Sequence, residues 1–416
     1  MKVKIYKILR YAMIVLYFLA LIVPTIHRFY PFYEEVPLVG IRKAENAPPK
    51  FSLGDWFCGK YAADTDKWIK DHHGFSTDMV RFHRYGLYKL TGQVVHAPAT
   101  NTDTLIGENG YLYENLYVAD AVRKPGMSES DISKFVNGLE QVRDELKERN
   151  TAFVVILAPN KALICPENLP AWARDLSRDE NSDYYLFKQE LENKGISCVD
   201  SNQYFKENWA THKQLHAPHS AHWSYYGAWM VFTNTIPLIN AQQALDIELP
   251  VPELKEIYSM KAGGMDDELR PQLNLPKFCE DYADRLVSEY PIANPDLGDA
   301  FVTAKNAREK KLKALVIGDS YGFGLCDAMV RQPMFDEVTY WYYCRTTYLV
   351  TGPMDYSEKR WLYATYNNKG IFPKKDAYEA YCKDADVVFY VLTTFNIDKF
   401  GWNFPKTMVH AFNNEQ

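Results

Sequence analysis

The sequence predicts an α/β fold, in which helices cover both faces of a largely parallel sheet, preceded by one membrane-spanning helix. Short apolar segments rich in β-branched residues alternate with amphipathic helical segments along the chain. This alternation is typical of parallel sheets. The chain also begins with basic residues followed by an uncharged apolar run, which is typical of a membrane anchor.

The apolar run at the N-terminus extends from Ala12 to Val23, and Lys2, Lys4, Lys7 and Arg10 precede it. It is shorter than the about 20 residues of a typical span, but Ile8, Leu9 and a snorkelling Arg10 extend it. A cleaved signal peptide is the alternative, although no Ala-x-Ala-like site follows the run. We therefore expect residues 1–28 to be an uncleaved, single-pass anchor. The basic residues then stay cytoplasmic and the C-terminal domain lies outside the cytoplasm.

The remaining chain divides into a stalk over residues 29–60 and one domain over residues 61–410. The stalk is rich in Pro, Tyr and Phe without a sustained period. Within the domain, hydrophobic periodicity predicts helices at 64–91, 128–150, 184–194 and from 224 to just before Pro237, a hairpin at 107–113, and strands at 151–158, 196–199, 313–317, 337–343 and 386–392. Residues 240–310 have no such pattern, and we expect an insertion there that passes over the rim of the site. Its acidic residues 266–268 suggest either a cation site or a solvated acidic loop.

The predicted strand at 313–317 ends in Gly318-Asp319-Ser320-Tyr321, followed by a segment able to form a helix. Gly318 allows a sharp turn. Ser320 would then face a crevice where backbone N–H groups can receive an oxyanion. The alternative is that Ser320 caps the helix and has no chemical role.

The best candidate base for Ser320 is His222, which lies in a loop just before a helix that Ser224 would cap. His216 and His219 precede it at a spacing of three, and imidazole is a good Zn²⁺ ligand, so a zinc site is an alternative interpretation of this cluster. Pro218 interrupts any helix across the three histidines, and no Cys or carboxylate lies within the cluster. We expect no metal, and solvated loop positions for His216 and His219.

Several segments resemble the AlgX/AlgJ-type alginate O-acetyltransferases and the related DHHW-type proteins, an SGNH hydrolase-like family. Residues 68–75 resemble the family's Trp-x-x-Asp-His-Phe segment, and residues 105–113 resemble its Gly-x-x-Gly-Trp-Leu-Phe/Tyr hairpin. Residues 158–170 resemble its Pro-x-Lys…Pro-Glu-x-Leu-Pro loop. His222-Trp223 resembles its Asp-x-His-Trp element, and Gly318-Asp319-Ser320 its later serine turn. The histidine precedes the serine, which resembles the rearranged order of this group rather than that of ordinary SGNH enzymes.

The resemblance implies that Ser320 is the nucleophile and His222 the base, with the orienting residue two positions before the histidine. That position is Ser220, where the family has Asp. A serine hydroxyl carries no charge to stabilise an imidazolium. Three outcomes follow: a slow Ser–His dyad, another carboxylate such as Asp200, or a non-catalytic relative.

We expect oxyanion or substrate binding near Ser320 from residues at the carboxyl ends of neighbouring strands. The backbone N–H of Ser320 is one donor, and Asn160 or Lys161 is a candidate second donor, although Lys161 could equally be buried. The candidate set for oxyanion or substrate binding is Gly318, Asp319, Tyr321, Asn160, Lys161 and Trp223.

The net charge, aromatic content and cysteine spacing of the chain indicate which kinds of partner and site it can have. The formal charge of −6 argues against nucleic acid, and aromatic residues make up 15% of the chain, enough to offer faces that stack on sugar rings. The seven cysteines lack a Cys-x-x-Cys pair, which argues against zinc-ribbon and thioredoxin-like sites. We expect Cys198 and Cys326 to be buried thiols.

We therefore expect an extracytoplasmic O-acetyltransferase of a bacterial cell membrane, acting on a polysaccharide acceptor without a cofactor. The resemblance implies a multi-spanning membrane acyltransferase as the acetyl donor. A carbohydrate acetylesterase with the same site, and a catalytically impaired accessory protein of a polysaccharide modification or export complex, are the alternatives. The sequence does not distinguish them, nor does it identify the polysaccharide.

Overall fold

The computed structural model describes residues 2–413, apart from 41–46, 96–99, 101, 123–125, 177–181, 212–214, 333 and most of 250–266, 277–310 and 353–382. The chain divides into two compact units. One comprises Met1–His96 with Pro271–Asp281, and the other comprises Ala97–Arg270 with Tyr282–Gln416. The helical region expected to open the main domain at residue 61 thus groups with the N-terminal part.

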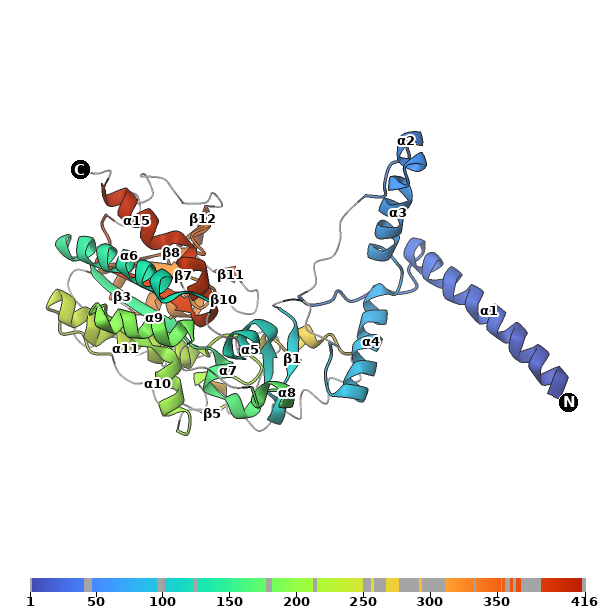
Figure 1. The fold of residues 1–416 in the computed structure, drawn as a ribbon, viewed down its shortest axis with the longest axis horizontal. Coiled ribbons are helices and arrows are strands. Elements are labelled where there is room, and N and C mark those ends of the chain that lie inside the picture. Colours follow the sequence, from blue (N-terminus) through green and yellow to red (C-terminus); the bar gives the residue numbers. More distant parts are fainter. Residues whose placement is uncertain are drawn as a thin grey trace. The chain divides into compact units, whose positions relative to one another are not determined.

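The first unit is helical. Its elements are α1 (Lys2–Phe29), α2 (Leu53–Phe57), α3 (Lys60–Asp71), α4 (Ser76–Thr91) and the 3₁₀ turn η5 (Pro271–Leu273) (Figure 1). Within α1, Tyr6–Phe29 is long and apolar enough to cross a membrane, and it is almost wholly exposed. By length and composition this helix fits a membrane anchor or a signal sequence.

The segment after α1 is tied to the turn between α3 and α4. The ring of His27 stacks on Phe75 with centroids 4.0 Å apart. The carboxylate of Glu35 accepts hydrogen bonds from Phe75 N at 2.7 Å and from the Thr77 hydroxyl at 2.8 Å. Burial raises the pKa of Glu35, but these hydrogen bonds, which favour the ionised form, lower it below its usual value.

The second unit is built on a seven-stranded sheet with the order β12-β9-β8-β7-β13-β3-β4. The strands are β3 (Ala152–Ala158), β4 (Cys198–Asp200), β7 (Leu312–Gly318), β8 (Phe335–Tyr342), β9 (Thr346–Val350), β12 (Ala364–Asn367) and β13 (Val387–Thr393). The five strands from β8 to β4 are parallel, and β9 and β12 add an antiparallel edge. The prediction of an α/β fold with a largely parallel sheet is confirmed.

Helices cover both faces of this sheet (Figure 1). Helices α6 (Glu129–Glu148), α9 (Asp183–Asn193) and α15 (Phe404–Asn413) share one core cluster with the sheet. Helix α6 begins at its N-cap Ser128 and buries the predicted apolar face from Ile132 to Leu146. Helices α11 (Tyr225–Gln243) and α13 (Gly322–Val330) pack together as a separate pair.

Helix α11 differs from the prediction at its end. Ser224 caps it as expected by accepting from Gly227 N at 2.9 Å. The helix was expected to stop before Pro237, but it continues to Gln243 with the proline inside. Most of its residues up to Ile239 are buried, so tertiary packing offsets the hydrogen bond that the proline removes.

Short elements join the larger ones. They are β1 (Thr104–Ile106), η1 (Glu108–Gly110), β2 (Leu112–Glu114), α5 (Asn115–Val122), α7 (Lys161–Ile164), η2 (Pro166–Asn168), α8 (Ala171–Arg174), α10 (Ser201–Asn208), β5 (Glu256–Ile257), β6 (Ile292–Ala293), β10 (Met354–Asp355), β11 (Arg360–Trp361) and η8 (Thr394–Asn403). The expected hairpin is present as β1 and β2. Most of the expected insertion at 240–310 lies outside the described residues. Cys326 is a buried free thiol as expected, whereas Cys198 is only partly buried.

Candidate active site

Ser320 lies in the turn between β7 and α13. Two glycines allow this turn to pack closely. A Cβ on Gly318 would come within 2.6 Å of the Val391 carbonyl oxygen. A Cβ on Gly322 would come within 2.5 Å of the Tyr340 ring. The turn therefore lies tightly against β13 and β8, with Ser320 partly exposed at the carboxyl end of β7.

Asp319 anchors the same turn from below. Its Oδ2 accepts hydrogen bonds from Thr393 N at 2.8 Å, the Thr393 hydroxyl at 2.6 Å and Asn396 Nδ2 at 2.9 Å. Its Oδ1 accepts from Tyr321 N at 3.2 Å. The side chain is 1% exposed, so Asp319 fixes the turn to the end of β13 and does not face a substrate.

The structure brings Ser320 and His222 together. His222 Nε2 lies 2.6 Å from Ser320 Oγ, although the residues are 98 positions apart in the chain. This is hydrogen-bond distance for a base that removes the serine proton.

Glu268 completes the arrangement. Its Oε2 lies 2.7 Å from His222 Nδ1 on the other side of the ring. A carboxylate there holds the imidazole in the tautomer whose Nε2 faces the serine, and stabilises the imidazolium. Ser320, His222 and Glu268 thus have the geometry of a Ser–His–acid triad. Glu268 lies in the acidic segment that the sequence suggested as a cation site or a solvated loop, and the structure corrects both interpretations for this residue.

Ser220 does not take the place of the acid. Its hydroxyl accepts from His222 N at 2.9 Å and lies 3.3 Å from Glu268 Oε2, to which it donates. Ala221 N also donates to Glu268 Oε2 at 3.3 Å. Ser220 therefore stabilises the loop and positions Glu268. The resemblance had implied that Ser220 itself contacts the imidazole.

Asp200, the alternative acid, is engaged elsewhere. Its Oδ1 caps α10 by accepting from Asn202 N and Gln203 N at 3.1 and 3.2 Å. Its Oδ2 accepts from the Tyr184 hydroxyl at 2.7 Å and pairs with Lys188 Nζ at 2.9 Å. The proposal of Asp200 as the orienting carboxylate is therefore wrong, because a helix cap and an ion pair occupy the side chain.

Lys161 supports the histidine loop from inside the protein. Its side chain is 1% exposed, and Nζ donates to the carbonyl oxygens of Pro218 at 2.9 Å and Ser220 at 2.5 Å. Burial lowers its pKa to about 7. Of the two alternatives that the sequence suggested for Lys161, the buried position is the one observed. Lys161 therefore positions the histidine loop and does not act as an oxyanion donor.

Asn160 is also fully buried. Its Oδ1 caps α7 by accepting from Ala162 N at 2.9 Å. Its Nδ2 donates to the Tyr117 carbonyl at 3.2 Å and to Asp120 Oδ2 at 2.9 Å. Since its amide hydrogens are committed, Asn160 does not supply the second oxyanion donor either.

Tyr321 and Trp223 lie beneath the site. Both are at most 1% exposed, and their rings meet edge to face with centroids 5.0 Å apart. The Tyr321 hydroxyl lies 2.8 Å from the carbonyl oxygens of both Pro159 and Ala221. These residues join the Ser320 turn to the histidine loop, and the expected contact of Trp223 or Tyr321 with substrate is corrected to this structural role.

Two donors remain for an oxyanion. The Ser320 N–H makes no hydrogen bond within the part of the chain that the structure describes. The hydroxyl of Tyr343, which follows β8, lies near the Ser320 side chain; burial raises the pKa of Tyr343, and the interaction with Ser320 opposes that rise. The N–H of Tyr343 donates to the Gly318 carbonyl at 2.8 Å, which fixes the residue beside the serine turn. No local pattern in the sequence indicates a role for Tyr343, because this residue reaches the site only through the pairing of β7 with β8.

The electrostatics of the site shift the pKa of His222 upward. Burial lowers the pKa of His222, but the charge and hydrogen bond of Glu268 raise it, and the charges of Glu114 and Asp319 add to this. The net pKa lies above the usual 6.5. A higher pKa makes the imidazole a stronger base once it has lost its proton.

The other two histidines of the cluster are buried rather than solvated. His216 is 0% and His219 is 2% exposed. His219 Nε2 lies 3.1 Å from the Gly110 carbonyl, and Nδ1 lies 3.5 Å from Asp267 Oδ1. Among the described residues, no group of three or more His, Cys, Asp or Glu side chains is arranged to hold a metal ion.

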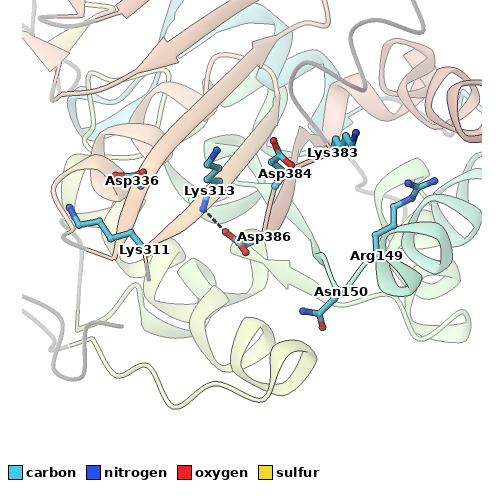
Figure 2. Close-up of a pocket in the computed structure, with 9 residues that line it drawn as sticks. Arg149, Asn150, Lys311, Lys313, Asp336, Lys383, Asp384 and Asp386 are labelled. Carbon is cyan, nitrogen blue, oxygen red and sulfur yellow. Dashed lines mark hydrogen bonds between the residues drawn. The ribbon is translucent and has the colours of Figure 1, made fainter. Parts of the chain in front are cut away.

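A charged pocket lies at the amino-terminal ends of β7 and β13, the opposite ends of these strands from the Ser320 site (Figure 2). Lys313 N donates to Asp386 Oδ2 at 2.8 Å there. Its other lining residues are Arg149, Asn150, Lys311, Asp336, Lys383, Asp384 and Ala385. No residue of the Ser320 site contributes to it.

Comparison with known proteins supports the resemblance. Residues 105–253 match the family model of the SGNH hydrolase-like domain of acetyltransferase AlgX. The expected resemblance is thereby confirmed, and with it the SGNH hydrolase-like class of the fold. No curated protein matches the chain.

Solved structures of low identity are also similar. The O-acetyltransferase domain of Pseudomonas putida AlgJ is 13% identical, with 75% of this chain and 99% of that chain covered and a TM-score of 0.44. Bacillus cereus PatB1 is 12% identical, with coverages of 71% and 96% and a TM-score of 0.40. Pseudomonas aeruginosa AlgX is 11% identical, with coverages of 74% and 66% and a TM-score of 0.37.

Proposed function

We propose that this protein is a membrane-anchored, extracytoplasmic O-acetyltransferase that transfers acetyl groups to hydroxyls of a cell-envelope or exported polysaccharide. The observation that supports this most is the continuous chain of contacts from Ser320 through His222 to Glu268, at 2.6 and 2.7 Å. The match of residues 105–253 to the SGNH hydrolase-like domain of acetyltransferase AlgX supports acetyl as the group transferred. The apolar helix at Tyr6–Phe29, long enough to cross a membrane, supports the proposed anchor.

The first step forms an acetyl-enzyme. His222 takes the proton of Ser320 Oγ, which attacks the carbonyl carbon of an acetyl ester. The Ser320 N–H and the Tyr343 hydroxyl stabilise the oxyanion. When the tetrahedral intermediate collapses, the bond from the acetyl carbon to the donor oxygen breaks, and His222 returns its proton to the leaving alcohol.

The second step passes the acetyl group to the polysaccharide. A sugar hydroxyl attacks the acetyl-serine while His222 takes its proton, and the same donors hold the new oxyanion. The Ser320 ester bond breaks and Oγ recovers the proton from His222. We infer that a multi-spanning membrane acyltransferase presents the acetyl donor at the outer face.

The test follows acylation and transfer separately. Full-length protein in detergent is incubated with a chromogenic acetyl ester, with and without sugar oligomers, and its intact mass is recorded. Wild type should gain one acetyl group, while Ser320→Ala gains none and His222→Ala slows acylation at least about 10³-fold. Ser130→Ala, at an exposed site on α6, is the matched control.

The outcomes separate the alternatives. Transfer predicts an acetylated oligosaccharide whose formation competes with hydrolysis. An esterase would turn over the ester at the same rate with or without sugar. A protein that only binds polysaccharide would form no adduct, and either result would refute the transferase proposal.

A further inference from the structure

The chain leaves the second unit directly after the triad acid. Glu268 belongs to that unit, whose first part ends at Arg270, and Pro271 begins the η5 turn of the first unit. Leu269 and Arg270 are the two residues that separate Glu268 from this turn. Because one residue spans at most about 3.6 Å of chain, the contacts that fix η5 also limit where the backbone of Glu268 can lie.

Within the second unit, the acidic segment is held against the histidine loop. Leu269 N donates to the His219 carbonyl at 2.9 Å. The buried carboxylate of Asp267 accepts from Arg270 Nε at 2.9 Å and from Arg270 Nη2 at 2.6 Å, which closes the turn around Glu268. These contacts hold the segment where it begins, and η5 follows where it ends.

Arg84 of α4 holds the η5 turn. Its Nη1 donates to the carbonyl oxygen of Gln272 at 2.7 Å and to that of Leu273 at 3.2 Å. Hydrogen bonds from an ionised donor are stronger than those between neutral groups. Arg84 is partly buried and Leu273 is buried, so water would replace the guanidinium poorly if it were removed. One charged side chain on α4 thus fixes two successive carbonyls shortly after Glu268.

Asn274 fixes the same turn to the segment between α1 and α2. Its Oδ1 accepts from Val39 N at 2.8 Å, and its Nδ2 donates to the Val39 carbonyl at 2.9 Å. The side chain therefore pairs with the backbone of Val39 as a neighbouring strand would. Asn274 is buried and has a φ of 49°, in the left-handed region where asparagine is enriched. The end of η5 is thus held as firmly as its carbonyls.

Helix α4 is in turn connected to the apolar helix α1. A Cβ on Gly74, which lies in the turn before α4, would clash with the Pro24 carbonyl oxygen in α1. The segment 68–75, which resembles a family motif without a role in the proposed chemistry, therefore packs closely on α1. Within the first unit, contacts continue from α1 through this segment and α4 to Arg84 and η5.

We propose that Arg84 and Asn274 are positioning residues for the triad acid, so that the helical unit that contains α1 keeps Glu268 within reach of His222. This rests on the proposed function, in which Glu268 orients His222, and adds a means of regulating that site. A change in the first unit that loosens η5 would withdraw the acid and leave a slower Ser–His dyad.

The pKa of His222 reports on Glu268 without any turnover. The charge and hydrogen bond of Glu268 raise this pKa, and the charges of Glu114 and Asp319, which stay in place in every variant, add to the rise. Full-length protein labelled with ¹³C at histidine Cε1 is titrated in detergent by NMR, and His222→Gln identifies the signal. Glu268→Gln gives the pKa of the ring without its acid.

Arg84→Met should move the His222 pKa at least half of the way from the wild-type value to that of Glu268→Gln. Asn274→Gly, which tolerates the same φ, should move it in the same direction. Arg84→Lys keeps a charged donor and should bring the pKa back toward wild type. Lys89→Met removes an exposed charge elsewhere on α4 and, as the matched control, should leave the pKa unchanged.

The other histidine signals, among them that of the buried His216, show whether each variant keeps its fold. A wild-type pKa of His222 in a folded Arg84→Met would overturn the proposal. Should Arg84→Met lose the fold, the result for Asn274→Gly decides in the same way.

A double-variant comparison separates positioning from general damage. Arg84→Met should lower kcat/KM for the chromogenic ester at least fivefold, mainly through kcat, because the acid acts on the chemical step. In a Glu268→Gln background the same substitution should lower it less than twofold, since the acid is already lost. Equal losses in the two backgrounds would contradict the positioning role.

Acetylation of Ser320 in the wild type is a separate measurement. A His222 pKa that depends on Arg84, without an acetyl adduct, would refute the transferase and retain the positioning role. An adduct together with a pKa that does not depend on Arg84 would do the reverse.

Discussion

Glu268 and His222 are 46 positions apart in the chain, yet Glu268 Oε2 lies 2.7 Å from His222 Nδ1. In the family that this chain resembles, the orienting residue stands two positions before the histidine, where this chain has Ser220. The Ser220 hydroxyl does not orient the ring and instead donates a hydrogen bond to Glu268. A carboxylate from a different loop thus reaches the ring. The acid therefore comes from position 268 rather than position 220, and a carboxylate still contacts the imidazole.

Glu268→Gln should lower kcat/KM for ester cleavage by about 10²- to 10⁴-fold, because an amide supports the wrong tautomer and no longer stabilises the imidazolium. Asp200→Asn is the matched control, since Asp200 caps α10 and pairs with Lys188. The rate of release of the chromogenic alcohol measures both variants. A rate for Glu268→Gln within threefold of wild type would exclude Glu268 as the acid.

Ser220→Asp should not raise activity, although it restores the residue of the family pattern. The new carboxylate would lie beside Glu268 Oε2, which is 3.3 Å from the present hydroxyl, and like charges at that distance destabilise each other. We expect activity at or below that of wild type. A gain in kcat/KM would show that position 220 can orient the ring directly.

The pH dependence of kcat/KM should show an acid limb above pH 6.5. The base must be neutral, and the folded protein raises the pKa of His222 above that value, so activity rises as His222 loses its proton. Removing the charge at Glu268 removes the main group that raises this pKa. The acid limb of Glu268→Gln should therefore move to lower pH, and an unmoved limb would contradict the assignment.

Lys161→Met should reduce kcat/KM at least tenfold. The carbonyls of Pro218 and Ser220 would lose their donor, and the loop that carries His222 would lose its support. Lys134→Met, which alters an exposed lysine on α6, is the control. Normal activity in Lys161→Met would remove the positioning role.

Lys161→Met should also change how the free energy of unfolding depends on pH. The pKa of Lys161 falls from 10.5 unfolded to about 7 folded, so the unfolded chain binds more protons between these values and wild-type stability rises with pH across that window. Denaturant unfolding at pH 7 and pH 10 should show this rise in wild type and not in Lys161→Met.

Local patterns in the sequence were sufficient to predict much of the fold. The apolar face of α6, the cap at Ser224 and the strand that ends at Gly318 depend on neighbouring residues. The end of α11 was not predictable in this way, because the burial of that helix outweighs the local effect of Pro237. His216 and His219 were expected in solvent and are buried, which depends on packing rather than on the loop sequence.

The sequence by itself determined the parallel α/β class and the two residues that carry the proposed chemistry, Ser320 and His222. Their local signals are a strand ending in a small-residue turn and a loop before a capped helix. Only the tertiary structure decided the acid, Glu268, and the neighbours Tyr343 and Glu114. The sequence predicts the strand that ends at Tyr343 and the hairpin beside Glu114, but it does not indicate a role for these side chains or for Glu268. Their positions relative to the imidazole and the serine are set by strand pairing and loop packing, which bring together parts of the chain that share no local pattern.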